Sequence, residues 1–288
     1  MREIYTRLGR IVALQDTLPL NEVRERRFAH GRTCPHCHSD RVQRHGRYSY
    51  VPQALREAGA PPDRYRYRCL ACRRTFNDLT ATPLSGLQFP DRYLEFLRCM
   101  ARQMSVRRAA RELGVQPATS FYWRHKTLAA FQAAPTQPLQ GIAEADETYF
   151  VENRKGERHL TERAPRHHGA RAQHRGLGAE QLCVAVARDR LGGTVARVAG
   201  YGTPGYPELD RAFQGALGAV DVLCTDAHRA YATLADRNNI RHVALNASRA
   251  ERRRGIYHIQ GVNGYHGRLK RFIGRFGGVN DRYLNHYL

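Results

Sequence analysis

The chain has 288 residues, and its 47 lysines and arginines against 26 aspartates and glutamates give a formal net charge of +21. Such a balance favours polyanionic partners, chiefly DNA or RNA, because each neutralised phosphate releases condensed counterions. No apolar run approaches the roughly 18 residues that a membrane-spanning helix needs, and the first residues lack the apolar segment of a secretory signal. We therefore expect a cytoplasmic, nucleoid-associated protein with no membrane partner.

The length allows two or three modules. Residues 1–30 form a short charged segment that we interpret as one helix. Residues 31–82 contain four of the seven cysteines, in the two Cys-x-x-Cys pairs Cys34/Cys37 and Cys69/Cys72. Zinc prefers four thiolates in a tetrahedron, and each pair presents two sulfurs from one tight turn. We expect one structural zinc in a zinc ribbon; the alternative is a small core of reduced cysteines.

Within this ribbon, His36 and His38 are competing ligands that we assign to the surface. We expect a turn at Gly46 and a loop over the Pro-rich stretch 51–63. Arginine and tyrosine alternate from Arg64 to Cys69, which predicts a strand with one basic and one aromatic face.

Residues 88–132 have helical periodicity and predict a helix-turn-helix-like DNA-binding region. Ser105 is placed to cap a helix that Gly114 ends, and Pro117 suits the first turn of the next helix. The DNA contacts we expect there are Thr119, Ser120, Arg124 and Lys126. The alternative is an ordinary helical hairpin with a solvated basic face. Trp123 is assigned to the core.

From residue 139 to 288 the pattern alternates between strands and helices, which predicts an α/β domain. The expected strands are 141–150, 181–190, 193–200, 219–225 and 241–246. The expected helices are 207–217, 228–238 and 262–275. Between the first two strands, residues 152–178 are rich in arginine, histidine and glycine, and we interpret them as a mobile basic excursion.

Two aspartates end apolar runs in this domain: Asp146 in Ile142-Ala-Glu-Ala-Asp146, and Asp226 in Val222-Leu-Cys-Thr-Asp226. Carboxylates gathered at strand ends are the hard oxygen ligands that magnesium prefers. Strand alternation places Glu144 and Asp146 on one face and Glu147 on the other, so we expect only one of the adjacent pair Asp146/Glu147 to face a given metal. The alternative for Asp226 is an ordinary helix N-cap.

Asn263 and Lys270 stand seven residues apart, which on a helix is about two turns and nearly the same face. An apolar stripe adjoins that face, so we expect the helix to pack while Asn263 and Lys270 look toward the aspartates. The alternative is a frayed surface helix, since Gly261, Gly264 and Gly267 weaken helix formation.

These residues occur in a recognisable order. The chain resembles insertion-sequence transposases of the DDE superfamily, in the group with an N-terminal zinc ribbon and an ISXO-two-like catalytic domain. The resemblance rests on the two cysteine pairs, on Ala145-Asp-Glu-Thr-Tyr-Phe150, on Thr225-Asp-Ala-His-Arg-Ala-Tyr231, and on His258, Asn263 and Lys270. It implies a ribonuclease-H-like fold, a mixed sheet flanked by helices, with two Mg²⁺ or Mn²⁺ ions.

Carried over by position, the resemblance makes Asp146, Asp226 and Asn263 the metal ligands, with Asn263 where many relatives have glutamate. It makes Lys270 a phosphate-binding residue, and Lys270 and Arg271 further DNA contacts. It implies binding of terminal inverted repeats and target DNA by a homodimer or larger synaptic complex, and a last helix shorter than in relatives. Two other functions stay open: an inactive zinc-ribbon DNA-binding regulator, and a nuclease or resolvase of the same fold.

Overall fold

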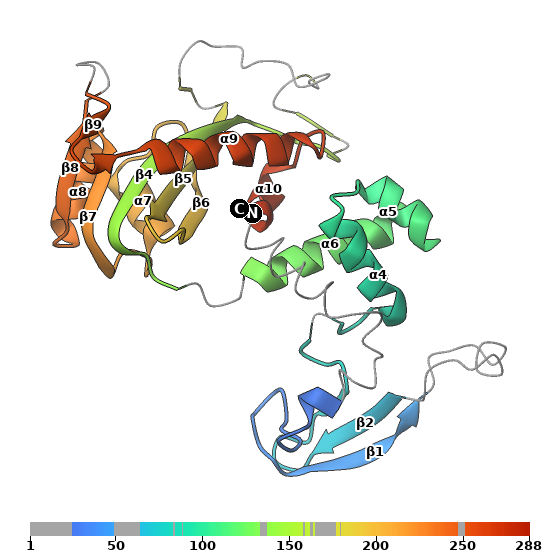
Figure 1. Cartoon of the computed structure of the whole chain (residues 1–288). Coiled ribbons are helices and arrows are strands. Elements are labelled where there is room, and N and C mark those ends of the chain that lie inside the picture. Colours follow the sequence, from blue (N-terminus) through green and yellow to red (C-terminus); the bar gives the residue numbers. More distant parts are fainter. Residues whose placement is uncertain are drawn as a thin grey trace. The chain divides into compact units, whose positions relative to one another are not determined.

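The computed structural model describes residues 25–48, 64–82, 84–87, 89–132, 137–157, 159–161, 164, 177–178, 180–246 and 251–288. The chain divides into two compact units, Met1–Phe131 and Gln132–Leu288, which are described separately below (Figure 1). Three predicted features fall wholly or mostly outside the described residues: the N-terminal helix, the loop over 51–63, and most of the basic excursion. No helix in the described part is long and apolar enough to cross a membrane.

The first unit begins with a three-stranded antiparallel sheet of β1 (Val42–Tyr48), β2 (Arg64–Cys69) and β3 (Thr75–Asn77), in the order β1-β2-β3. The predicted alternation in β2 is confirmed, because Tyr67 is buried against Phe76 while Arg66 is exposed. The predicted turn at Gly46 is wrong. Gly46 lies within β1 at a shift of register against β2, with a φ of 137°, so the glycine permits a bulge.

The helices α4 (Pro90–Ala101), α5 (Val106–Leu113) and α6 (Pro117–Gln132) follow. Their boundaries confirm the predicted local signals: the Ser105 side chain accepts a hydrogen bond from the Arg108 amide, and Gly114 ends α5 with a φ of 61°. Trp123 is buried, with its ring 6.0 Å from that of Tyr93 and 5.6 Å from that of Phe96. It is a core residue, as predicted.

The second unit is built on a five-stranded mixed sheet in the order β6-β5-β4-β7-β8. Its strands are β4 (Gln140–Val151), β5 (Gln181–Asp189), β6 (Thr194–Tyr201), β7 (Ala219–Asp226) and β8 (Arg241–Leu245). The β4, β5 and β6 strands are antiparallel, whereas β7 and β8 run parallel to β4. All five predicted strands are present, within one or two residues at each end.

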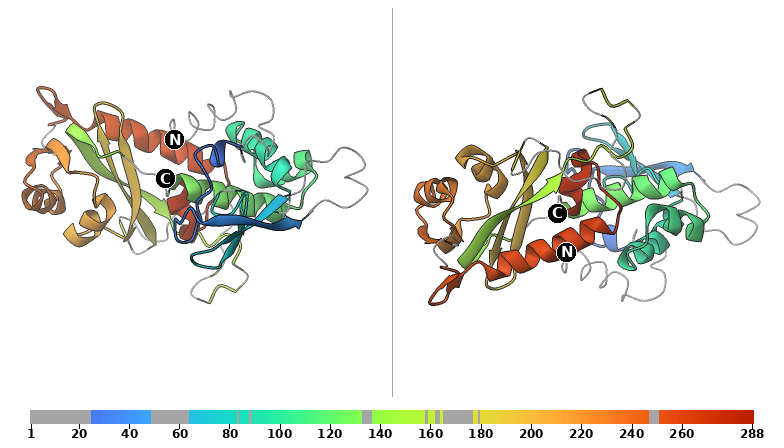
Figure 2. Two further views of the ribbon diagram at one scale, coloured as in Figure 1. Left: turned by 90° about the horizontal axis from the view of Figure 1, so that it is seen from below. Right: turned by 90° about the horizontal axis from the view of Figure 1, so that it is seen from above.

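Helices cover both faces of this sheet (Figure 2). On one face, α7 (Tyr206–Phe213) and α8 (Arg229–Arg237) bury the main core against small residues of the sheet such as Ala143, Ala145 and Ala185. On the other face, α9 (Gln260–Gly274) lies across β4 and β5, after the short hairpin of β9 (Arg253–Arg254) and β10 (Tyr257–His258). The sheet therefore presents alternate β4 side chains to α8 and to α9.

The first residues of the predicted excursion are held in place by the C-terminal segment. The Asn153 amide donates to Asp281 over 3.0 Å, and Lys155 Nζ donates to the carbonyl of Phe276 over 2.9 Å. The interpretation of 152–178 as mobile throughout is therefore wrong at its start. The partner segment includes α10 (Asp281–Tyr287), a helix that periodicity did not predict and that Asn280 caps.

Candidate active site

The two aspartates singled out by the sequence lie together. Asp146 is in the middle of β4 and Asp226 ends β7, the parallel strand beside it. One carboxylate oxygen of each, and one of Glu147, lie within 4.8 Å of one another. Three acidic groups from two neighbouring strands thus form one cluster, which we call the carboxylate cluster.

The inclusion of Glu147 corrects the expectation that only one of the adjacent pair could take part. The alternation itself holds, because Glu144 and Asp146 face α9 while Glu147 lies near His228, the residue before α8. The pairing of β4 with β7, however, extends only to Glu144 opposite Cys224. Beyond that point Asp146 and Glu147 pair with β5 alone, so both side chains can reach Asp226 around the free edge of β4.

Burial and mutual repulsion dominate the electrostatics of this cluster. Burial, and then the charge of Glu147, raise the pKa of Asp146 to about 7. Burial and the charge of Asp226 likewise raise the pKa of Glu147 to about 7. Lys270 is the cation that opposes the shift at Asp146. The cluster is therefore poorly neutralised by the protein itself.

Helix α9 brings a histidine that sequence reasoning missed. His266 Nδ1 lies 3.8 Å from an Asp146 carboxylate oxygen, and burial followed by the charge of Lys270 lowers the pKa of His266 to about 4. Asn263 and Lys270 are exposed, one turn before and one turn after His266. Since i, i+3 and i+7 positions share a helix face, Asn263 and Lys270 lie on the same side of α9 as His266, and the charge of Lys270 acts on Asp146. The spacing from Asn263 could have identified His266.

The start of α9 is fixed by a second acidic residue of β4. Glu144 is 2% exposed and accepts a hydrogen bond from the Val262 amide over 2.9 Å. Its carboxylate forms an ion pair with Arg190 and lies 3.3 Å from His258 Nδ1. Gly261 makes room for it, because a Cβ there would lie 3.0 Å from both carboxylate oxygens. Glu144 therefore sets the position of α9 relative to β4.

The helix-cap alternative for Asp226 holds only in part. Asp226 Oδ1 accepts a hydrogen bond from the His228 amide over 3.0 Å, just before α8. The N-cap position itself is occupied by His228, which has no side-chain capping bond. The second carboxylate oxygen thus stays available to the cluster.

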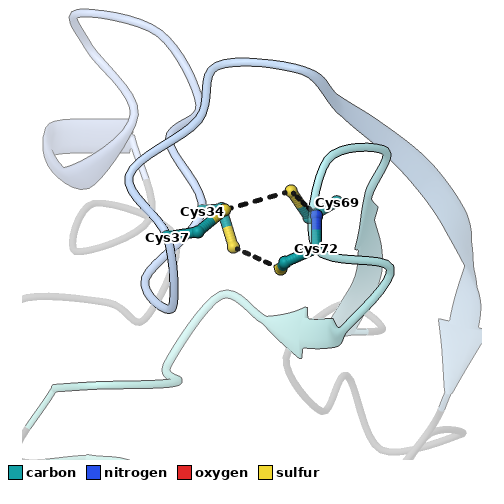
Figure 3. Close-up of side chains that lie close together, drawn as sticks. All are labelled: Cys34, Cys37, Cys69 and Cys72. Atoms are coloured by element: carbon teal, nitrogen blue, oxygen red, sulfur yellow. Dashed lines mark hydrogen bonds between the residues drawn. The ribbon is translucent and has the colours of Figure 1, made fainter.

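The four cysteines of the first unit converge as the sequence predicted (Figure 3). The Cys34 and Cys72 sulfurs lie 3.6 Å apart, as do those of Cys37 and Cys69. Tetrahedral zinc with bonds of about 2.3 Å requires sulfurs about 3.8 Å apart, so the four fit one zinc ion. Amide hydrogen bonds, first that of Cys72, lower the pKa of Cys69 to about 6. His36 and His38 are exposed and outside this group.

Most of the DNA contacts predicted on α6 point into the first unit. Ser120 and Arg124 are buried, and Arg124 donates to the carbonyl of Met104. Lys126 donates to the carbonyl of Ser85. Because these three side chains pack or bond inside the first unit, they are not free to contact a DNA groove. The structure therefore does not support their prediction as DNA contacts. Thr119 is half-buried at the start of α6, and Lys270 and Arg271 are exposed on α9.

Comparison with known proteins places this mixed α/β unit in a family. Residues 138–288 match the model of the ISXO2-like transposase domain. The chain belongs to that transposase family.

A curated relative, described as an uncharacterized protein in transposable element ISH50 of Halobacterium salinarum, is 30% identical over 167 residues. The match covers 57% of this chain, and the chain spans about half the length of that relative, 51%. Among solved structures, a pre-cleavage Mos1 transpososome is 13% identical with a TM-score of 0.26 over 68% of this chain and 73% of its own. A Mos1 transposase paired-end complex is 14% identical, also with a TM-score of 0.26; the match covers 68% of this chain and 72% of the Mos1 chain.

Proposed function

We propose that the chain is the DNA transposase of an insertion sequence, which binds terminal inverted repeats and catalyses metal-dependent strand cleavage and strand transfer. The observation that carries the proposal is the meeting of Asp146 and Asp226 beneath α9 in a chain of a transposase family. The mixed sheet flanked by helices supports a ribonuclease-H-like catalytic domain.

Asp146, Asp226 and Asn263 would hold Mg²⁺ or Mn²⁺. Three features support the fit: oxygen donors, partial burial, and carboxylates close enough that burial and mutual repulsion raise the pKa of Asp146 and Glu147. When bound, two such ions activate a water or 3′-hydroxyl and neutralise charge on the phosphate. The aspartates would act as ligands, and no histidine base is required.

The other residues of α9 would orient the DNA. Lys270 is exposed and its charge reaches Asp146, so it is placed to hold a phosphate next to the reacting one. Arg271 would contact the backbone beside it. The amide of Asn263 can ligate a metal but adds no charge, so its contribution to affinity is smaller than that of a carboxylate.

The first unit would bind DNA through a zinc ribbon and a helix-turn-helix-like region. The four sulfurs fit a structural zinc, because four thiolates leave no open coordination position for water. The basic surface lies on α5, where Arg107, Arg108 and Arg111 are exposed. These arginines and Thr119 would form the phosphate and groove contacts of the helix-turn-helix-like region.

The test is incubation of the purified chain with Mg²⁺ or Mn²⁺ and labelled inverted-repeat DNA. Cleavage that requires metal, and that Asp146→Asn and Asp226→Asn each reduce at least about 100-fold, supports the proposal, because losing an outer partner of a ligand alone costs 10–100-fold. Asp221→Asn removes an exposed carboxylate of β7 and is the matched control.

The same assay separates the two alternatives. Tight DNA binding without cleavage by the wild type supports an inactive regulator, for which the neutral Asn263 is the motivating observation. Cleavage without a strand-transfer product supports a nuclease or resolvase. A joined product excludes both.

A further inference from the structure

We propose that Glu147 is a further metal ligand of this site and supplies the negative charge that Asn263 lacks. The inference rests on the proposed function, since it concerns the same metal centre. It departs from the assignment by resemblance, which uses only Asp146, Asp226 and Asn263.

The first argument is position. One oxygen of Glu147 lies within 4.8 Å of oxygens from both aspartates. Adjacent residues of a regular strand point to opposite faces, so this approach needs a strand edge that is open. The pairing of β4 with β7 stops at Glu144. From the next residue on, the edge of β4 that faces β7 is open, so the Glu147 side chain can turn around this edge toward Asp226.

The second argument is the lack of a partner. The Glu147 side chain is 8% exposed, and its Oε1 has no hydrogen-bond partner among the described residues. His228 Nδ1, at 3.9 Å, is beyond hydrogen-bonding distance and is itself buried without a partner. The Tyr231 hydroxyl is the one neutral side-chain donor that acts on this carboxyl group among the described residues, and no cation pairs with it. A buried carboxylate oxygen without a donor is costly unless a cation neutralises it. Glu144, the other buried glutamate of β4, has Arg190 and the Val262 amide.

The third argument is charge. Asp146 and Asp226 supply two negative charges, and the exposed amide of Asn263 supplies none. With Glu147 the first coordination shell carries three negative charges from residues on β4 and β7. Divalent affinity rises with the number of charged ligands. Glu147 thus supplies to the site a third negative charge, which the amide of Asn263 does not.

The test measures binding of Mn²⁺ alone to the full-length, zinc-loaded chain without DNA, by titration calorimetry and by the Mn²⁺ electron paramagnetic resonance signal. Glu147→Gln keeps the size of the side chain and removes the charge. We expect it to weaken Mn²⁺ binding at least about 10-fold. Asn263→Ala should weaken binding less, and Asp221→Asn, on the exposed side of β7, should leave it unchanged.

The outcomes separate this inference from the proposed function. If Asp146→Asn weakens Mn²⁺ binding while Glu147→Gln binds as the wild type does, the role of Glu147 is overturned and the metal site stands. If neither variant weakens binding, both are overturned. The rise in thermal stability caused by Mn²⁺ gives a second readout on the same variants, and circular dichroism verifies that each is folded.

Discussion

Asp146 and Glu147 are neighbours in the sequence whose side chains leave opposite faces of β4 and meet again at Asp226. Without a cation the three carboxylates repel one another in a partly buried site, and this repulsion adds to burial in raising the pKa of both residues to about 7. The cluster is therefore a local source of instability in the metal-free protein.

This instability has a defined pH dependence. An acid whose pKa is raised in the folded state binds more protons folded than unfolded, so the free energy of unfolding falls as pH rises from about 4 to about 7. In the double variant Asp146→Asn/Glu147→Gln, we expect the free energy of unfolding to decrease less over this pH range than in the wild type. The measurement is the thermal midpoint from pH 4.5 to 8 without added Mg²⁺. Parallel curves for variant and wild type would contradict the raised pKa values.

At the residue scale, the sequence was sufficient to single out the two aspartates, because each follows an apolar run that is recognisable from the pattern alone. Only Asp226 ends its strand, whereas β4 continues for five residues beyond Asp146. It was insufficient for Glu147. The rule of alternating faces describes a strand within a sheet, and the divergence of β4 from β7 is a tertiary feature. Arg124 shows the same limit, since the packing of α6 decides which of its polar residues are buried.

Among the elements, α9 matters most because two of its side chains, His266 and Lys270, act on Asp146 of the carboxylate cluster. Its first turn is attached to β4 by Glu144, which accepts the Val262 amide and pairs with Arg190. A carboxylate at a helix N-terminus also interacts favourably with the helix dipole. Glu144 is thus a positioning residue for the site, without belonging to the cluster.

We expect Glu144→Gln to lower the free energy of unfolding by about 1–3 kcal/mol, because it weakens a buried charge-assisted hydrogen bond and removes the carboxylate that neutralises Arg190. Hydrogen exchange should be faster at the Val262 amide than in the wild type. Asp221→Asn should change stability by less than about 0.5 kcal/mol. Unchanged exchange at the first turn of α9 would rule out this positioning role.

Elements with local signals were the most predictable. Ser105, Gly114 and Pro117 define the ends of α5 and the start of α6 by their own backbone and side-chain chemistry. In contrast, α10 is short, and part of its stability comes from residues more than 120 positions earlier. The Asn153 amide donates to Asp281, and the side chain of the cap residue Asn280 donates to the Lys155 carbonyl. Such a helix has no periodic signature long enough to recognise.

For the whole molecule, the first unit depends on its four cysteines. The core of the three-stranded sheet has four buried residues: Cys34, Tyr67, Cys69 and Phe76. A core of this size is too small to stabilise so short a segment without a metal. We expect one zinc per chain by atomic absorption. Removing it with a strong chelator should unfold the sheet, measured by hydrogen exchange of β1 and β2, while β4 and β5 keep their protection.

A chelated protein that retained protection in β2 would show that the cysteines act as ordinary core residues. Cys37→Ser is the corresponding variant, since the Cys37 sulfur lies 3.6 Å from that of Cys69 and the residue is exposed. Loss of the Cys37 sulfur should abolish zinc binding and have little direct effect on packing.

The central claim is that side chains distant in sequence hold divalent metal at the edge of β4. The most direct measurement is the anomalous diffraction of crystals soaked in Mn²⁺. We predict a peak about 2 Å from carboxylate oxygens of both Asp146 and Asp226, absent in crystals of Asp226→Asn. Manganese bound elsewhere, with both aspartates free of metal, would contradict the account.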